Sequence, residues 1–129
     1  IDSMGLKGKV TLKGRTNDVR KELLGSSCLV MSSRFEGFPM ILLEALATGL
    51  PIVSYDCPKG PSEIVTIGAN GYLAKVGDTG TLAQGICSVI ANEELRKRFG
   101  AESKRRSENF SLEKTMEKWD ALFKSALKR

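Results

Sequence analysis

Short apolar runs alternate with helix-like segments along most of this chain, and this alternation restricts its fold more than any other feature. The runs that we expect to form strands are residues 9–12, 28–31, 51–55 and 72–74. Residues 28–31 are continuously apolar, which is typical of a strand covered on both faces. Strands that alternate with helices form parallel sheets with helices packed against them. We therefore predict an α/β fold with a parallel sheet of about four strands and C-terminal helices.

Residues that favour helix ends mark the expected helices. Asp18 is the predicted N-cap of a short helix, and Ser111 is the predicted N-cap of the last one. Pro39 suits the first position of a helix that Gly49 and Pro51 would close. Further helices are expected at 61–65, from 78 onward, and at 93–108.

The last predicted helix has one apolar face. The helical spacing of the apolar residues on this face fits a docking surface, or a part of the core, better than a cofactor site. The residues of this stripe are Leu112, Met116, Trp119, Phe123 and Leu127.

Charge is concentrated toward the C-terminus. The chain carries a net charge of +5, and 11 of its 20 Lys and Arg lie after position 91, with 7 of its 15 Asp and Glu. Such a segment could contact a polyanion, but we favour a solvated helix face. A nucleic-acid site would need aromatic side chains between the basic ones, and only two aromatic residues lie nearby. The basic residues concerned are Arg96, Lys97, Arg98, Lys104, Arg105 and Arg106. We expect no nucleic-acid partner.

The chain has no histidine, so a Ser-His or Cys-His nucleophile pair and a His-containing zinc site are excluded. Cys28, Cys57 and Cys87 stand far apart, and their odd number fits a reducing cytosol better than a disulfide framework. No run approaches the roughly 20 apolar residues of a membrane-spanning helix, and no signal segment is recognised. We therefore expect a cytoplasmic location.

Two glutamates belong to the region of the predicted helix that begins near Pro39, one before the helix and one within it. Glu44 is the only charged residue between Gly37 and Tyr55. We therefore expect it to be buried and to need hydrogen-bond donors, either from a ligand or from the protein. Glu36 precedes the helix, in the loop at the carboxyl end of a predicted strand, where α/β sheets bind ligands. The helix start between them favours an anion such as a diphosphate.

The segment from Glu36 to Glu44 resembles the E-x7-E motif of retaining GT-B glycosyltransferases of the "group 1" family. The following residues 45–54 resemble the continuation of that motif. Residues 58–65, 68–73 and 10–14 also resemble the family in order and spacing. The resemblance implies a Rossmann-like three-layer lobe, with residues 1–129 forming part of the C-terminal nucleotide-sugar-binding lobe. It also implies that the first strands of this lobe and the whole acceptor lobe are absent from the chain.

The resemblance implies roles for individual residues. Glu36 would contact the hydroxyls of the donor sugar and act as the catalytic residue. Glu44 would bind the ribose hydroxyls. Arg34 and Arg15 have an equally good interpretation as solvated loop residues. The implied donor-binding set is Gly14, Arg15, Arg34, Glu36, Gly37, Phe38, Pro39, Met40, Ile41 and Glu44.

By the same resemblance, the whole enzyme would transfer a sugar from a nucleoside diphosphate to an acceptor hydroxyl with retention. A likeness to bacterial surface-polysaccharide transferases points to a UDP-sugar donor, polysaccharide or glycolipid synthesis, and a lipid-linked or saccharide acceptor bound by the other lobe. The family also implies peripheral association with the inner membrane face. The chain has no Asp-x-Asp pair, so we expect no metal, and no cofactor is implied. The alternative is a non-catalytic basic α/β binding module, which would bind no nucleotide and tolerate replacement of Glu44.

Overall fold

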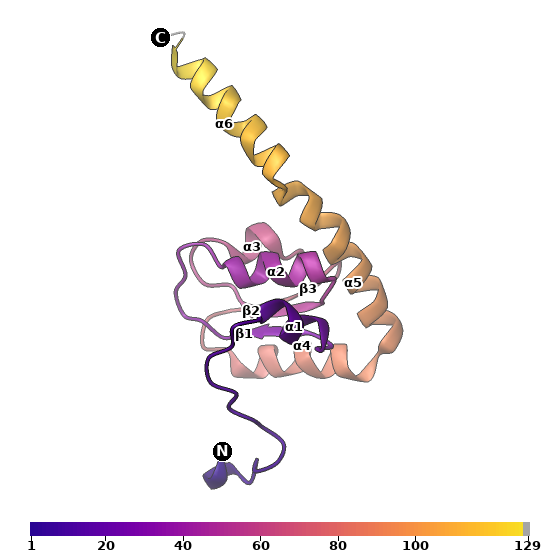
Figure 1. The fold of residues 1–129 in the computed structure, drawn as a ribbon. Coiled ribbons are helices and arrows are strands. Elements are labelled where there is room, and N and C mark those ends of the chain that lie inside the picture. Colours follow the sequence, from indigo (N-terminus) through magenta and orange to yellow (C-terminus); the bar gives the residue numbers. More distant parts are fainter. Residues whose placement is uncertain (128–129) are drawn as a thin grey trace.

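The computed structural model describes residues 1–127 and contains three parallel strands with helices on both faces of the sheet (Figure 1). The prediction of an α/β fold with C-terminal helices is confirmed. The strands are β1 (Leu29–Met31), β2 (Ile52–Tyr55) and β3 (Gly71–Ala74). The helices are α1 (Val19–Leu24), α2 (Met40–Thr48), α3 (Pro61–Ile64), α4 (Thr79–Ala91), α5 (Glu93–Ser107) and α6 (Leu112–Leu127), with short 3-10 turns at Asp2–Met4 and Glu108–Phe110.

The strands stand in the sheet in the order in which they occur along the chain, β1-β2-β3. Val30 pairs with Val53, and Val53 pairs with Tyr72. The crossovers between these parallel strands contain α2 and α3. Gly71, the first residue of β3, approaches β2 so closely that a Cβ there would overlap the carbonyl oxygen of Ile52. The sheet therefore admits only glycine at this position.

The central strand separates two apolar cores. All four residues of β2 are buried, as expected for a strand covered on both faces. Ile52 faces one cluster and Val53 the other, because successive side chains point to opposite faces of a sheet. The first cluster lies mainly against α2 and α3, and contains Leu23, Met31, Leu42, Ala45, Leu46, Leu50, Ile52, Cys57, Ile64 and Val65. The second lies mainly against α4 and α5, and contains Val53, Tyr55, Ala74, Leu82, Val89 and Phe99.

Helix α5 is fixed to the rest of the fold by polar contacts from its second half. The hydroxyl of the buried Ser103 donates a hydrogen bond to the carbonyl oxygen of Leu50 at 2.7 Å. The ammonium of Lys104 donates to the carbonyl oxygen of Ala47, near the end of α2, at 2.6 Å. The charged helix predicted at 93–108 thus caps the carbonyl end of α2 and does not simply face solvent.

The predicted first strand at residues 9–12 is wrong. This segment is exposed, and its only ladder contact is an isolated bridge between Lys7 and Val10. Figure 1 shows the N-terminal segment running away from the sheet. A strand needs a neighbour to satisfy its backbone groups, and none of the described strands pairs with this segment. The sheet consequently has three strands instead of about four.

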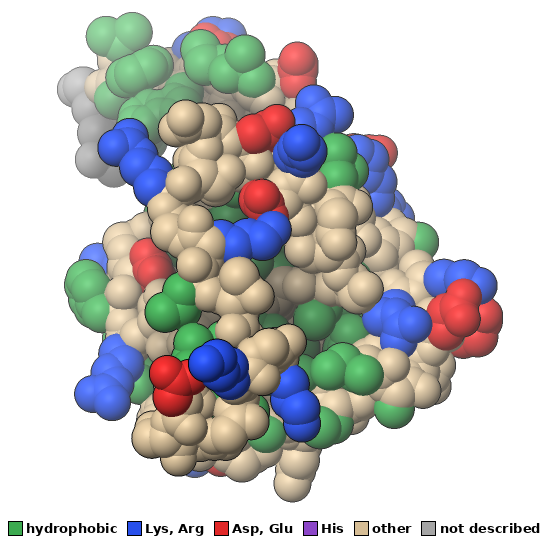
Figure 2. Space-filling view, turned by 60° about the horizontal axis from the view of Figure 1, so that its bottom comes forward, with side chains coloured by type: hydrophobic (Ala, Val, Ile, Leu, Met, Phe, Trp, Pro, Cys, Tyr) green, Lys and Arg blue, Asp and Glu red, His purple; other side chains and the backbone are tan. Residues whose placement is uncertain are grey.

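Helix α6 extends away from the body (Figure 1). Its apolar face is not covered by any other part of residues 1–127. Leu112, Met116, Trp119 and Phe123 are all exposed, and Trp119 stacks on Phe123 with ring centroids 5.6 Å apart. In Figure 2, apolar side chains gather at the upper left of the molecule. The stripe predicted from the sequence exists, but it forms no part of a core within residues 1–127. None of the helices in this range is long and apolar enough to span a bilayer.

Candidate donor-binding site

Three loops meet at the carboxyl edge of the sheet. They follow β1, β2 and β3 and span residues 32–39, 56–60 and 75–78. Because the three strands are parallel, their carboxyl ends lie along the same edge, which is the usual place for ligands in open α/β sheets. The loop that the sequence predicts to be functional, with Glu36 and Gly37, therefore lies where such a site would be.

Glu36 lies close to Cys57, at the point where the loops after β1 and β2 approach each other. Burial raises the pKa of the Cys57 thiol, and the negative charges of Glu36 and Asp56 raise it further. Cys57 is only 2% exposed and stays a neutral thiol. It is therefore not an activated nucleophile. Glu36 itself is half-buried and belongs to the loop before α2.

Helix α2 starts one residue later than predicted. Pro39 occupies the N-cap position with φ −78°, and Met40 is the first helical residue. The proline ring disfavours the helical conformation at the preceding residue, Phe38. The helix therefore does not extend toward the N-terminus beyond Pro39. None of the side chains in residues 1–127 caps the start of α2, so the first turn keeps backbone N–H groups that a bound anion can accept from. The amides of Met40 and Ile41 belong to this turn.

The rest of the loop presents exposed side chains. Arg34, Phe35 and Phe38 are exposed, and Phe35 retains 73% of its surface. At Gly37 a Cβ would meet no atom within 4 Å. The glycine is therefore not required by crowding within residues 1–127, and the open space beside it is available to a ligand.

The prediction that Glu44 is buried is wrong. Helix α2 buries Leu42, Ala45 and Leu46 against the sheet, while Glu44 lies on the exposed side. The apolar residues of this helix suggested burial all round, yet only one face is covered by the described chain. Glu44 consequently needs no partner from the protein and is free to accept hydrogen bonds from a ligand.

Glu44 lines two hollows on the surface. The larger has a volume of about 610 Å³ and lies between the start of α1, the second half of α2 and α5. Its lining is Asn17, Asp18, Val19, Arg20, Leu23, Glu44, Ala47, Thr48 and Lys104. The smaller, of about 360 Å³, runs from Met40 past Glu44 to the turn before α6. Met40 and Glu44 of the predicted site thus share one hollow.

Other members of the predicted set are not brought together in this way. Glu36, Gly37 and Phe38 line neither of these two hollows. Gly14 and Arg15 lie on the exposed segment before α1, and Gly14 adopts the positive φ of 68° expected for a turn. The segment reaches the larger hollow only through Asn17 and Asp18.

The polar residues that share the larger hollow with Glu44 were not predicted from the sequence. Asn17 and Thr48 border it, and Arg20 and Lys104 bring positive charge to it. Lys104 was predicted to lie on a solvated helix face, and Arg20 was given no role, because no local pattern reveals that α1, α2 and α5 converge. For Asn17 the sequence offered one indirect indication. It directly precedes the predicted N-cap Asp18, whose side chain accepts a hydrogen bond from the Lys21 amide at 2.9 Å, so its place at the start of α1 could be predicted.

Comparison with known proteins connects this geometry with one family. A family model described as "Glycosyl transferases group 1" matches residues 1–106. A poly(ribitol-phosphate) alpha-N-acetylglucosaminyltransferase of Staphylococcus aureus is 32% identical over 97% of this chain and 26% of its own length. A poly(glycerol-phosphate) alpha-glucosyltransferase of Bacillus subtilis is 33% identical over 92% of this chain and 18% of its own length.

A solved structure is also similar to this chain. The crystal structure of a TarM mutant from S. aureus, in complex with Fondaparinux, alpha-GlcNAc-glycerol and UDP, superimposes with a TM-score of 0.89 at 31% identity, covering 95% of this chain and 25% of that chain. The curated relatives that share 32% identity with this chain are longer, and the chain spans 14% to 34% of their length. The E-x7-E segment, the parallel sheet and the family match over residues 1–106 agree, and the chain belongs to the group 1 family of glycosyltransferases.

Proposed function

We propose that this chain forms part of the donor-binding lobe of a glycosyltransferase that moves a sugar from a UDP-sugar to an acceptor hydroxyl. The reaction belongs to the synthesis of a bacterial polysaccharide or glycolipid and retains the configuration of the anomeric carbon. The observation that carries the proposal is the position of the Glu36–Glu44 segment, at the carboxyl edge of the sheet, within the part of the chain that matches the family. The longer relatives support a second lobe outside this chain that binds the acceptor.

The names of the relatives support the donor and the stereochemistry. Two relatives are named as transferases that form alpha-linked glucosyl and N-acetylglucosaminyl products. The common UDP-sugars carry these sugars in alpha linkage, so an alpha product corresponds to retention. The matching TarM structure contains UDP and a saccharide. These relatives favour UDP over other nucleoside diphosphates as the carrier.

In this proposal each glutamate contacts a different end of the donor. Glu44 lies in the second turn of α2 and lines open hollows, so its carboxylate can accept hydrogen bonds from the two ribose hydroxyls. The uncapped first turn of α2, at Met40 and Ile41, faces the diphosphate. Glu36 lies on the other side of that turn, in the loop after β1, where the sugar would follow the diphosphate.

The catalytic contribution of these groups is to position the donor and to stabilise charge. As the bond to the sugar breaks, negative charge grows on the leaving diphosphate, and preorganised N–H groups at the start of α2 stabilise it. Glu36 holds the sugar hydroxyls, so that the anomeric carbon faces the incoming acceptor. Arg34 and Lys59 are exposed in loops at the same edge, and they can add positive charge next to the diphosphate.

Location and acceptor follow from the same proposal. Nucleotide sugars are cytoplasmic metabolites, so the donor site faces the cytoplasm. The acceptor is a saccharide or a lipid-linked saccharide bound by the other lobe. A lipid-linked acceptor would bring the enzyme to the inner membrane face as a peripheral protein.

The test is saturation-transfer NMR of the chain with UDP, GDP and their glucose and N-acetylglucosamine conjugates. Binding of UDP that weakens about tenfold or more in Glu44→Gln, the change expected when a charge-assisted hydrogen bond is lost, would support the donor site. Glu36→Gln is expected to weaken a UDP-sugar while leaving UDP itself unaffected. Glu117→Gln, which removes an exposed carboxylate from α6, is the matched control and should bind as the wild type does.

The basic binding module is the alternative that this experiment can favour. It predicts no nucleotide binding, and instead binding to any polyanion that weakens steeply as salt rises. A longer protein that contains this chain and ignores every nucleotide sugar would contradict the glycosyltransferase proposal.

A further inference from the structure

Two loops at the carboxyl edge touch each other at Gly60 and Pro39. Both residues are buried, and Gly60 has a φ of 105°, which side chains rarely adopt. A Cβ on Gly60 would overlap Cδ of Pro39, and would lie 3.0 Å from its Cγ and 3.6 Å from its nitrogen. Any residue larger than glycine at position 60 therefore has to displace Pro39 or move away from it.

Pro39 cannot be displaced easily. Its ring fixes its own φ, and its carbonyl oxygen accepts the first hydrogen bond of α2, from the amide of Leu42 at 2.9 Å. A displacement of Pro39 would therefore shift the start of α2 and the end of the loop that carries Glu36, three residues earlier.

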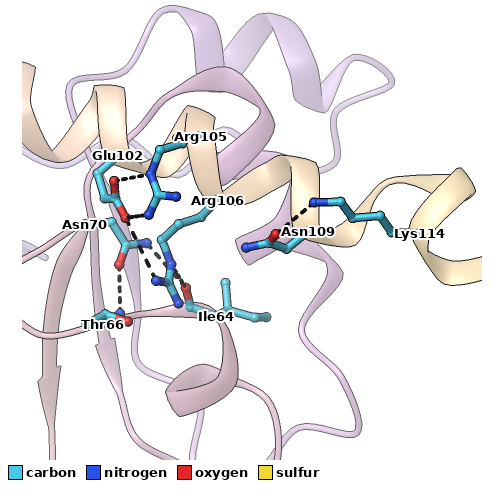
Figure 3. A network of polar contacts seen from close by, with 8 residues as sticks. All are labelled: Ile64, Thr66, Asn70, Glu102, Arg105, Arg106, Asn109 and Lys114. Carbon is cyan, nitrogen blue, oxygen red and sulfur yellow. Dashed lines mark hydrogen bonds and ion pairs between the residues drawn. The ribbon is translucent and has the colours of Figure 1, made fainter. Parts of the chain in front are cut away.

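Helix α3, which follows Gly60 in the sequence, is fixed by hydrogen bonds at its C-terminal end. It runs from Pro61 to Ile64, and its last carbonyl oxygen, of Ile64, accepts hydrogen bonds from Arg106 Nε and Asn70 Nδ2, both at 3.4 Å (Figure 3). The side-chain oxygen of Asn70 in turn accepts from the amide of Thr66 at 2.7 Å, which fixes the chain immediately after α3. Gly60 thus lies between Pro39 and an anchored helix.

We propose that Gly60 is a positioning residue for the sugar end of the donor site, acting through Pro39 on Glu36 and on the first amides of α2. The inference rests on the proposed function, since it assumes that Glu36 and the start of α2 contact the donor. Gly60 itself contacts no donor. The absence of a side chain lets the loop after β2 close against Pro39, and this contact sets where the Glu36 loop ends and α2 begins.

The experiment compares Gly60→Ala with Gly68→Ala in the whole chain. Gly68 also has a positive φ, of 78°, but a Cβ there would meet nothing within 4 Å, so this control places a side chain at a positive φ without the collision. In Gly60→Ala we expect shifted amide resonances of residues 36–38, 40 and 41, and about tenfold weaker binding of UDP-glucose, because small misplacements in a binding site are costly. Binding of UMP, which reaches Glu44 but not the sugar end, should change by less than about twofold. Gly68→Ala should change neither ligand.

The double variant Pro39→Ala/Gly60→Ala separates the collision from every other effect. It removes the ring carbons that the new methyl group would meet. Gly60→Ala should therefore cost less than about threefold in UDP-glucose affinity when position 39 is alanine. An equal loss in both backgrounds, equal losses for UMP and UDP-glucose, or unchanged resonances at residues 36–41 would overturn the proposal.

Failure of the proposed function would give a different experimental result from failure of the Gly60 proposal. If the wild-type chain binds neither ligand, the donor site is contradicted, while the resonances of residues 36–41 still decide whether Gly60 positions this loop. If Gly60→Ala does not fold, recovery of the fold in the double variant supports the contact, and an unfolded double variant overturns it.

Discussion

Gly49, which ends α2, and Gly100, in the middle of α5, bring their two backbones into direct contact. A Cβ on Gly100 would lie 2.5 Å from the carbonyl oxygen of Gly49, and a Cβ on Gly49 would lie 3.4 Å from the carbonyl oxygen of Gly100. Gly49 also has a φ of 75°, which lets the chain leave the helix and turn toward β2. The absence of side chains at both positions allows α5 to reach the carbonyl end of α2.

Gly100→Ala is expected to destabilise the fold despite the higher helix propensity of alanine. The new methyl group meets a backbone atom that cannot rotate away, so we expect a loss of about 1–3 kcal/mol. Gly80→Ala is the matched control, because Gly80 lies in the first turn of α4 and a Cβ there meets only Asp78 Oδ1, at 3.5 Å. It should leave stability unchanged or raise it by up to about 1 kcal/mol. Urea denaturation of both variants tests this, and equal midpoints would contradict the contact.

Asn70→Ala is expected to cost about 1–3 kcal/mol, because a buried side chain that bonds two backbone groups would be lost. Asn70 is fully buried and holds the Thr66 amide and the Ile64 carbonyl (Figure 3). Asn109→Ala serves as the comparison, since Asn109 is exposed and bonds only the Lys114 ammonium, at 3.1 Å, among the described contacts. That variant should stay within about 0.5 kcal/mol of the wild type. Thermal melts of the two variants that coincide would refute the assigned role of Asn70.

The contribution of Asp78 to stability should depend on pH. Hydrogen bonds from the backbone and hydroxyl of Thr81 lower the pKa of the Asp78 carboxyl in the folded state. Since the folded pKa is depressed, the stabilisation is present above the unfolded pKa and is lost as pH falls through the folded pKa. The advantage of the wild type over Asp78→Ala should therefore be largest near neutral pH and shrink on acidification below about pH 4. Urea midpoints of both proteins across this range provide the measurement, and a constant difference would argue against the shift.

Cys57 and Cys87 should differ in reactivity. Burial raises the pKa of Cys57, and Cys87 is exposed on α4. Iodoacetamide needs an accessible thiolate, so at pH 8 we expect Cys87 to react at least about tenfold faster than Cys57. Peptide mass spectrometry of partially labelled protein measures this ratio. Faster labelling of Cys57 would show that the loop after β2 opens readily.

Much of the architecture could be predicted from local sequence signals. Strands at 28–31, 51–55 and 72–74 were expected, and they differ from β1, β2 and β3 by one residue at the start. The expectation that 28–31 is covered on both faces is wrong, because Val30 of β1 is exposed. The caps at Asp18 and Ser111 were also expected, and both accept hydrogen bonds from the helices that follow them. These features depend on short stretches of chain, in which composition and caps determine conformation.

The errors arose where distant segments decide the outcome. Residues 9–12 have a strand-like composition but no strand of the described chain beside them. Glu44 stands among apolar residues, but one side of α2 is left uncovered. The hollow that joins Asn17, Arg20 and Lys104 to Glu44 depends on the packing of three helices, which no single segment of sequence encodes.

The order of the strands has a consequence for how the chain folds. Neighbouring strands of the sheet are consecutive in sequence, so the sheet closes over the crossovers at 32–51 and 56–70, which are shorter than the separation between α5 and its partners. Helix α5 joins from much farther along, and the bond from Ser103 to Leu50 spans 53 positions. Short loops lose less entropy on closing than long ones, so the sheet with α2 and α3 can form before α5 docks. Amide protons of α5 should consequently exchange with solvent through a partial opening that leaves the central strand protected.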